Sequence, residues 1–428
     1  MSLIGRIIDR LLTKGSITVI EPGKPPATYG PGGGKEVTVR LADRKVAFQL
    51  FRNPRLGLGE AYMDGRLVVE NGTILDLLEL ITGNNRWEDG RQGRKLLQRG
   101  KGGLRRLLAS NNNRKRAKRN VAHHYDLGDD LYELFLDSDR QYSCGYFTST
   151  DNDLEQAQWD KKAHIAAKLA LEPGQTVLDI GSGWGGLAIY LHQAAKVDVL
   201  GVTLSEDQLR VARIRAKEAG VADHVRFELI DYRNLQGEFD RIVSVGMFEH
   251  VGAEYYEEFY TACRRLLRRD GVMLLHTIGK FGATSKPDPF TDKYIFPGYH
   301  LPSLSQMCAA SEKAQLIVND VETLRLHYAY TLRHWLQSVR DNRAKIEAMY
   351  DARFFRMWEF YLCGGIVMFE SGAGCNYQIQ YIRDRHALPI TRDYMADDEK
   401  RLRLKPNGTK KGGPAQSRRA SSKETEPA

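Results

Sequence analysis

Hydrophobic residues in the first 90 positions follow both helical and strand patterns. Leucines and isoleucines recur at helical spacing across residues 1–15, with basic residues between them. This pattern favours a helix docked on its own domain over a membrane-surface helix. An apolar stretch from Ile74 to Ile81 predicts a second helix, and three short apolar runs predict β-strands at residues 16–20, 36–41 and 45–51. We therefore expect a small α+β domain, associated with lipid or membrane, over residues 1–90.

Farther along the chain, apolar runs alternate regularly with helical patterns. Five runs read as strands, at residues 176–181, 197–203, 225–230, 241–246 and 272–278. This alternation predicts an α/β fold with a parallel, doubly wound sheet. Helical insertions are expected near Leu304–Ala314 and Leu332–Met349, and residues 376–384 read as a closing strand. We assign residues 120–390 to this catalytic domain.

Two segments differ sharply in composition from the predicted domains. Residues 91–119 contain twelve Lys or Arg residues and no acid, which is typical of a solvated linker. Leucines within this segment also permit a contact with an anionic membrane, and the lack of aromatic residues disfavours a nucleic-acid arm. Residues 405–428 are almost entirely polar, so we expect a disordered basic tail.

Overall composition narrows the possible partners. The formal net charge is +9, which indicates a polyanionic partner, either nucleic acid or an anionic membrane. No apolar run approaches the ~20 residues that a spanning helix needs. Five scattered cysteines without C-x-x-C spacing argue against a disulfide framework and a zinc site. We expect a cytoplasmic protein without a bound metal that meets the membrane from outside.

A glycine-rich turn follows the strand at residues 176–181. Gly181, Gly183 and Gly186 fit a dinucleotide fingerprint, so the glycines alone do not choose the cofactor. A nicotinamide site usually has an acid at the end of the second strand, but that strand ends in Thr203. The acid lies on the first strand, as Asp179, and another, Asp231, follows the third. This arrangement favours S-adenosylmethionine.

Longer motifs surround this core, among them "QYSCGYF", "VLDIGSGWGGLA", "FEHVG", "HTIG" and "HYAYTLRHW". Their order over residues 120–384 resembles the cyclopropane-fatty-acid synthases, including the mycolic acid cyclopropane synthases. The resemblance implies a fold similar to class I methyltransferases and an action on unsaturated acyl chains of membrane phospholipids.

The resemblance also implies two sets of site residues. Ligands of a bicarbonate that acts as the catalytic base would be Cys144, Glu249, His276, Ile278 and Tyr328. Residues expected around S-adenosylmethionine are Tyr142, Ser143, Asp179, Gly181, Gly183, Trp184, Gly185, Thr203, Ser205, Gln208, Asp231 and Tyr232. Cys144 is not expected to be a nucleophile, because the reaction needs none.

The expected activity is transfer of a methylene group to a cis double bond, by an enzyme peripheral to the inner face of the cell membrane. The alternative is a fatty acid methyltransferase that makes methyl- or methylene-branched chains, since both reactions begin with the same alkylation. A nucleic-acid methyltransferase and a non-catalytic lipid-binding protein are disfavoured by the acyl-chain motifs and the intact site. A homodimer and the preferred acyl chain stay open at this stage.

Overall fold

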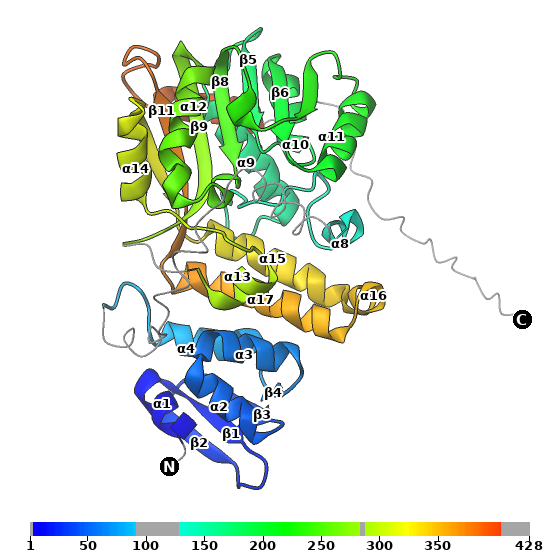
Figure 1. The fold of residues 1–428 in the computed structure, drawn as a ribbon, viewed down its shortest axis with the longest axis vertical. Coiled ribbons are helices and arrows are strands. Elements are labelled where there is room, and N and C mark those ends of the chain that lie inside the picture. Colours follow the sequence, from blue (N-terminus) through cyan, green and yellow to red (C-terminus); the bar gives the residue numbers. More distant parts are fainter. Residues whose placement is uncertain (1–2, 91–127, 283–286, 404–428) are drawn as a thin grey trace, which may run out of the picture.

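The computed structural model describes residues 3–90, 128–282 and 287–403, which form three tiers along the long axis (Figure 1). A small four-stranded sheet lies at one end, a layer of helices in the middle, and a seven-stranded sheet at the other end. The predicted basic linker at 91–119 and the predicted tail at 405–428 lie outside the described residues.

The first tier contains four strands in the order β2-β1-β3-β4, with helices packed against them. Helix α1 carries Leu11, which is buried together with the adjacent Leu12, as expected for a helix docked on its own domain. The elements are α1 (Leu3–Leu11), β1 (Gly15–Ile20), β2 (Ala27–Gly32), β3 (Glu36–Leu41), α2 (Arg44–Arg52), α3 (Pro54–Met63), β4 (Leu67–Asn71) and α4 (Ile74–Gly83).

The predicted strand at residues 45–51 is wrong, because these residues form helix α2. The Asp43 side chain accepts hydrogen bonds from the backbone N–H groups of Lys45 and Val46, at 2.7 and 3.2 Å, and so caps the helix. Val46 is fully buried, whereas Phe48 and Phe51 are 63% and 50% exposed. A strand would have placed Val46 and Phe48 on the same face, but a helix separates them.

The middle tier joins the two sheets through one hydrophobic core that spans the first tier and the helical layer. Polar contacts reinforce the junction: the Tyr62 hydroxyl donates to Glu359 at 2.6 Å, and Arg340 donates to the same carboxylate at 2.7 Å. The single helix predicted near 332–349 is two helices separated at Asn342. The helices of this layer are α13 (Pro289–Tyr294), α15 (His327–Asp341), α16 (Arg343–Met349) and α17 (Ala352–Glu370).

The seven-stranded sheet has the order β10-β11-β9-β8-β5-β6-β7. The predicted parallel sheet is wrong for β11, which runs antiparallel to both neighbours. Helix α17 ends at Glu370 beside the carboxyl edge of the parallel strands, and after three intervening residues β11 enters the sheet from that edge. The strands are β5 (Thr176–Ile180), β6 (Asp198–Thr203), β7 (Val225–Leu229), β8 (Phe239–Val245), β9 (Leu267–Lys280), β10 (Ile317–Leu324) and β11 (Gly374–Ile382).

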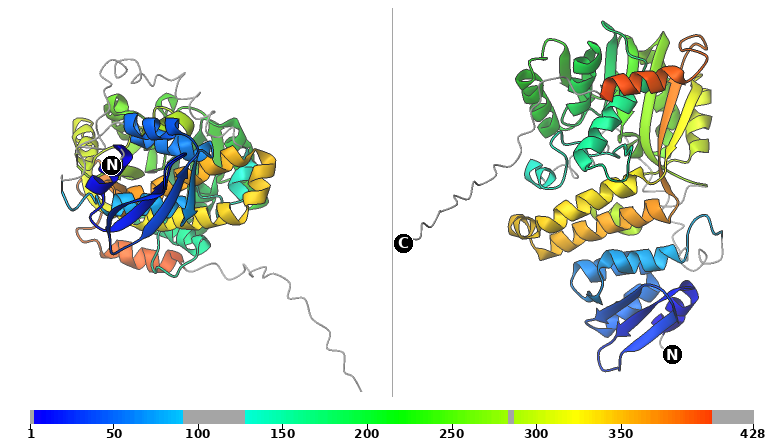
Figure 2. Two further views of the ribbon diagram at one scale, coloured as in Figure 1. Left: turned by 90° about the horizontal axis from the view of Figure 1, so that it is seen from below. Right: turned by 180° about the vertical axis from the view of Figure 1, so that it is seen from behind.

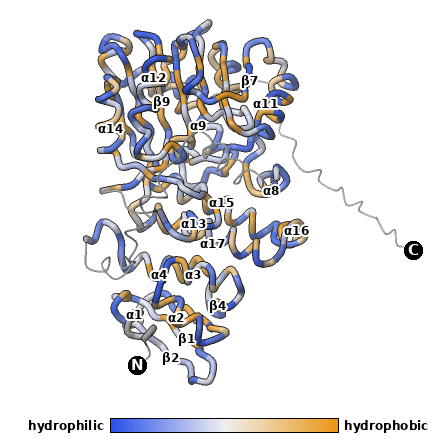
Figure 3. The backbone as a smooth tube through the Cα atoms, viewed as in Figure 1, coloured by the Kyte–Doolittle hydropathy of each residue, from blue (hydrophilic) through white to orange (hydrophobic). Residues whose placement is uncertain are grey.

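Helices cover both faces of this sheet, as Figure 2 shows from behind. One face is covered by α9 (Leu154–Lys168), α10 (Gly186–Ala195), α11 (Glu206–Glu218) and α18 (Asp393–Arg403), and the other by α12 (Tyr256–Leu266) and α14 (Leu304–Lys313). Figure 3 shows that hydrophobic residues concentrate in the strands and the inner helices. The carboxyl edge of the parallel strands faces the helical layer, because α17 of that layer leads into β11 at this edge. The candidate site lies at the same edge.

Candidate functional site

A cavity opens at the carboxyl ends of β5, β6, β7 and β8. Its walls include ten of the residues expected around the cofactor: Tyr142, Ser143, Asp179, Gly181, Gly183, Trp184, Thr203, Gln208, Asp231 and Tyr232. The two remaining expected residues do not line it. A Cβ on Gly185 would meet Phe227 at 2.6 Å, so this glycine permits close packing. The Ser205 hydroxyl instead caps α11 by accepting from the Gln208 N–H at 3.3 Å.

The glycine turn uses backbone conformations with positive φ, which glycine adopts most readily. Gly181 and Gly183 have positive φ values of 86° and 54°. A Cβ on Gly183 would meet no atom within 4 Å, because this residue faces the open cavity. The backbone can therefore approach a ligand closely at this position.

Asp179 is a buried carboxyl group at the cavity wall. Burial raises its pKa to about 7, and the Lys161 ammonium offsets this only in part. Its Oδ2 atom has no hydrogen-bond partner among the described residues, and the same holds for the neighbouring Ser182 hydroxyl. Buried polar atoms without partners are costly, so this wall is suited to a cationic or hydrogen-bonding ligand.

Glu249 lies beyond the end of β8 and contacts β9. Its Oε1 atom accepts a hydrogen bond from the Ile278 backbone N–H at 2.7 Å. Its Oε2 atom is buried and has no partner within the described chain. Burial raises the pKa of Glu249 to about 7, against the lowering effect of the Ile278 N–H. The structure thus brings Glu249 and Ile278 together and leaves one carboxylate oxygen available.

The His276 ring lies in the interior of the sheet, held between two amides. Its Nε2 and Nδ1 atoms are each 3.1 Å from the side-chain amide nitrogens of Asn376 and Gln378. Burial lowers the pKa of His276 well below its ordinary value, so the ring is neutral. A neutral ring has one donor and one acceptor, hence one of the two amides presents its oxygen.

Cys144 and Tyr328 lie in the core shared by the first tier and the helical layer, and Ile278 packs against the same core. Burial raises the pKa of the Cys144 thiol, and the sulfur donates to the adjacent Gly145 carbonyl at 3.3 Å. The thiol is therefore protonated, in agreement with the expectation that it is not a nucleophile.

Sequence and structure comparisons converge on one family. The family model described as mycolic acid cyclopropane synthetase matches residues 112–379. The chain belongs to this family. It is 41% identical over 287 residues to the probable fatty acid methyltransferase of Pseudomonas putida (64% of this chain, 73% of that protein). It is 36% identical over 365 residues to the cyclopropane-fatty-acyl-phospholipid synthase of Escherichia coli strain K12 (84% and 89%).

Solved structures of this family share the fold. The mycolic acid cyclopropane synthase CmaA1, complexed with SAH and CTAB, is 34% identical and superposes with a TM-score of 0.58, covering 62% of this chain and 97% of that chain. The family therefore includes enzymes of cyclopropane formation and a protein named a fatty acid methyltransferase.

Lys161 on α9 is a functional candidate that sequence reasoning missed. Its side chain is fully buried, and its ammonium donates to Gln141 Oε1 at 2.7 Å and to Ser143 Oγ at 2.8 Å. Both acceptors belong to residues that line the cavity. A lysine within a mostly polar helical segment gives no sequence signal of burial, so only the packing of α9 reveals it.

Other cavity residues were also missed, although most follow the ends of strands that sequence analysis had identified. They are Arg140, Gln141, Ser182, Leu204, Arg233, Met247 and Tyr255. Arg233 donates to the carboxylate of Asp231 at 2.9 and 2.6 Å, so it orients an expected cofactor residue. Proximity to a strand end was the signal that could have found this group.

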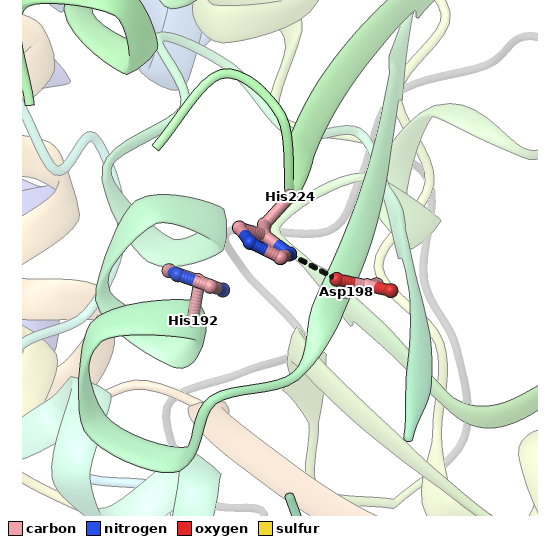
Figure 4. Close-up of side chains that lie close together, drawn as sticks. All are labelled: His192, Asp198 and His224. Atoms are coloured by element: carbon pink, nitrogen blue, oxygen red, sulfur yellow. Dashed lines mark hydrogen bonds and ion pairs between the residues drawn. The ribbon is translucent and has the colours of Figure 1, made fainter. Parts of the chain in front are cut away.

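One cluster with metal-ligating side chains lies at the amino edge of the same sheet (Figure 4). His224 Nδ1 is 2.7 Å from Asp198, while His192 Nδ1 is 2.8 Å from the Val197 carbonyl. The two imidazole rings stack with centroids 4.7 Å apart and an interplanar angle of 15°. Lone pairs in nearly parallel planes cannot converge on one ion, so this arrangement is a surface hydrogen-bonded cluster.

Proposed function

We propose that this protein transfers a methylene group from S-adenosylmethionine to the cis double bond of unsaturated acyl chains in membrane phospholipids. S-adenosylmethionine, when bound, would supply the methyl group: the alkene would take the methyl group and release S-adenosylhomocysteine, and a base would accept a methyl proton from the resulting chain cation as the cyclopropane ring closes. The observation that carries the proposal is the placement of Glu249 beside β9, with one buried carboxylate oxygen free to orient a base.

The cavity fits S-adenosylmethionine, which would supply the methyl group. The exposed backbone at Gly183 provides a close approach, and the orphaned Asp179 oxygen would meet a cationic part of the ligand. Thr203, Gln208, Asp231 and Tyr232 line the same cavity on the neighbouring strand ends. The structure of CmaA1 with SAH supports this assignment.

Bicarbonate, when bound, would supply the base that accepts the methyl proton. Glu249 Oε2 would accept the bicarbonate O–H and so orient its basic oxygen, because an ionised carboxylate only accepts. The Tyr328 hydroxyl would donate to the anion, and His276 would do so by exchanging one of its amide partners. Cys144 and Ile278 complete the proposed set from the core side.

Aromatic rings around Tyr142 would stabilise positive charge on the acyl chain. Tyr142 stacks on Trp335 with centroids 5.1 Å apart and lies 5.2 Å from Tyr132. Ring faces attract cations by their quadrupole, most strongly where water is excluded. Tyr142 also lines the cavity, so this group of rings lies beside the proposed reaction centre.

A second candidate is a fatty acid methyltransferase that forms methyl- or methylene-branched chains. The 41% identity to the Pseudomonas putida fatty acid methyltransferase favours it. Both products arise from the same alkylation and differ in how the cation is resolved. The ring closes when the added methyl group loses its proton to the base. A methylene branch would form if a hydride shift moved the cation before that proton was lost, and a methyl branch would require a hydride donor as reductant.

We further propose a cytoplasmic protein that works at the inner face of the cell membrane and needs no metal. Within the described part of the chain, no helix combines the length and apolar character of a membrane span. Access to phospholipid would then come through a surface, either the basic segment at 91–119 or another part of the molecule. The acyl-chain family disfavours a nucleic-acid partner.

The deciding experiment measures turnover on phospholipid vesicles in carbonate-depleted buffer, with bicarbonate then added back. Wild-type activity should recover, and Glu249→Gln should recover poorly. Mass spectrometry with labelled methionine identifies a ring or a branch in the product. A wild-type enzyme that ignores bicarbonate would contradict the proposed base, and a branched product would favour the second candidate.

A further inference from the structure

Helix α2 exposes an aromatic pair to solvent. Phe48 and Phe51 are 63% and 50% exposed, more than any other aromatic side chain of the described residues. They lie three residues apart and therefore share one face of α2. The opposite face of the helix is occupied, because Val46 is fully buried and Leu50 packs against the core.

Four basic residues surround this pair. Arg44, Lys45 and Arg52 lie on α2, Arg55 follows on α3, and all four are exposed. None of them forms an ion pair with any described residue, and the nearby Asp43 carboxylate is bound by Arg66 at 2.8 Å. We name this set, Arg44, Lys45, Phe48, Phe51, Arg52 and Arg55, the α2 face.

Helix α2 packs against α3, and α3 packs against α17 of the helical layer. Helix α3 also packs against α13, since a Cβ on Gly59 would meet Phe290 at 2.3 Å.

The positive charge of the α2 face favours an anionic partner over a second copy of the chain. Contact with a second copy across a two-fold axis would bring the four cations against the same four cations. An anionic lipid surface is complementary to them, and basic residues near such a surface strengthen binding to it. Phenylalanine side chains partition into the headgroup and acyl boundary of a bilayer.

We propose that the α2 face docks on an anionic phospholipid surface, with Phe48 and Phe51 inserted between headgroups and the four basic residues over lipid phosphates. The inference rests on the proposed function in one respect, namely that the substrate is a membrane phospholipid. It also assigns the membrane contact to the α2 face, in place of α1 or the segment at 91–119.

The test measures binding of the full chain to vesicles that contain phosphatidylglycerol and to vesicles of phosphatidylcholine alone. Phe48→Ser/Phe51→Ser should weaken binding to both kinds of vesicle by about tenfold. Arg44→Ser/Lys45→Ser/Arg52→Ser/Arg55→Ser should weaken binding to phosphatidylglycerol by about a hundredfold and remove its salt dependence. All substituted side chains are exposed, so thermal unfolding should be unchanged.

Matched controls lie on the catalytic tier. Ile214→Ser on α11 removes a side chain that is 47% exposed, and Lys217→Ser/Arg226→Ser removes two exposed cations; neither should alter vesicle binding. Wild-type binding by both α2-face variants would overturn the proposal and favour the segment at 91–119. A change of sedimentation behaviour with unaltered vesicle binding would overturn it in favour of a contact between copies. SAH calorimetry on the same proteins tests the proposed function separately, because the α2 face is outside the cavity.

Discussion

Replacement of Asp179 by Asn should raise the stability of the ligand-free protein and lower its affinity for the cofactor. Burial raises the pKa of this carboxyl group from 3.8 to about 7. Each pKa unit is worth about 1.4 kcal/mol, so the ionised carboxylate costs the folded state on the order of 4 kcal/mol above pH 7. The folded protein holds this proton more tightly than the unfolded chain does. The wild type therefore loses stability as the pH rises from about 4 through 7.

Asp179→Asn removes the charge but keeps the shape of the side chain. We expect the variant to be more stable than the wild type by about 2–4 kcal/mol at pH 8 and equally stable near pH 4. The measurement is urea unfolding of both ligand-free proteins at pH 4, 6 and 8. Asp223→Asn, at an exposed position, is the control and should not change stability at any pH.

The same substitution should weaken binding of S-adenosylmethionine by at least tenfold in calorimetry, because the ligand loses the carboxylate that balances its positive charge. Equal stability of Asp179→Asn and wild type at pH 8 would refute the argument that this carboxylate is buried without compensation. Unchanged cofactor affinity would refute its role at the cavity wall. The two results are independent, since the first concerns the empty protein.

Three further predictions concern the same cavity. Gly183→Leu should abolish cofactor binding in calorimetry, because the leucine side chain would occupy the open space beside the turn. The φ of 54° at this position also strains a residue that carries a Cβ. Retained binding would contradict the role of this glycine in admitting the cofactor. Lys161→Met should weaken SAH affinity about tenfold, since Gln141 and Ser143 lose their donor, while an unaltered affinity would leave Lys161 with a structural role alone. Turnover of the wild type should rise with pH through about 7 as Glu249 ionises, because only the carboxylate form accepts the proposed O–H. Glu249→Gln should lower turnover 10²–10⁴-fold and should lack this rise. An identical pH profile in the variant would exclude Glu249 as the source of the rise.

The sequence by itself determined the elements whose signal is local. The strand at residues 176–181 and the helix after its glycine turn follow from adjacent residues, because apolar runs and left-handed glycines constrain the backbone directly. The alternation of strands and helices also predicted parallel strands, whose carboxyl ends share one edge of the sheet, so most of the expected cofactor residues line one cavity.

Tertiary structure decided whatever depends on distant partners. Residues 45–51 form a short apolar run that suits a strand, yet burial of Val46 against the core, together with the local Asp43 cap, makes them a helix and leaves Phe48 and Phe51 exposed. The reversed direction of β11 follows from where α17 ends, a position that no local pattern encodes. Lys161 becomes an internal cation only because α9 packs against the loop that carries Gln141 and Ser143. Burial and charge compensation arise from the whole fold, and they determine which of the polar residues seen in the sequence have shifted pKa values or unpaired atoms.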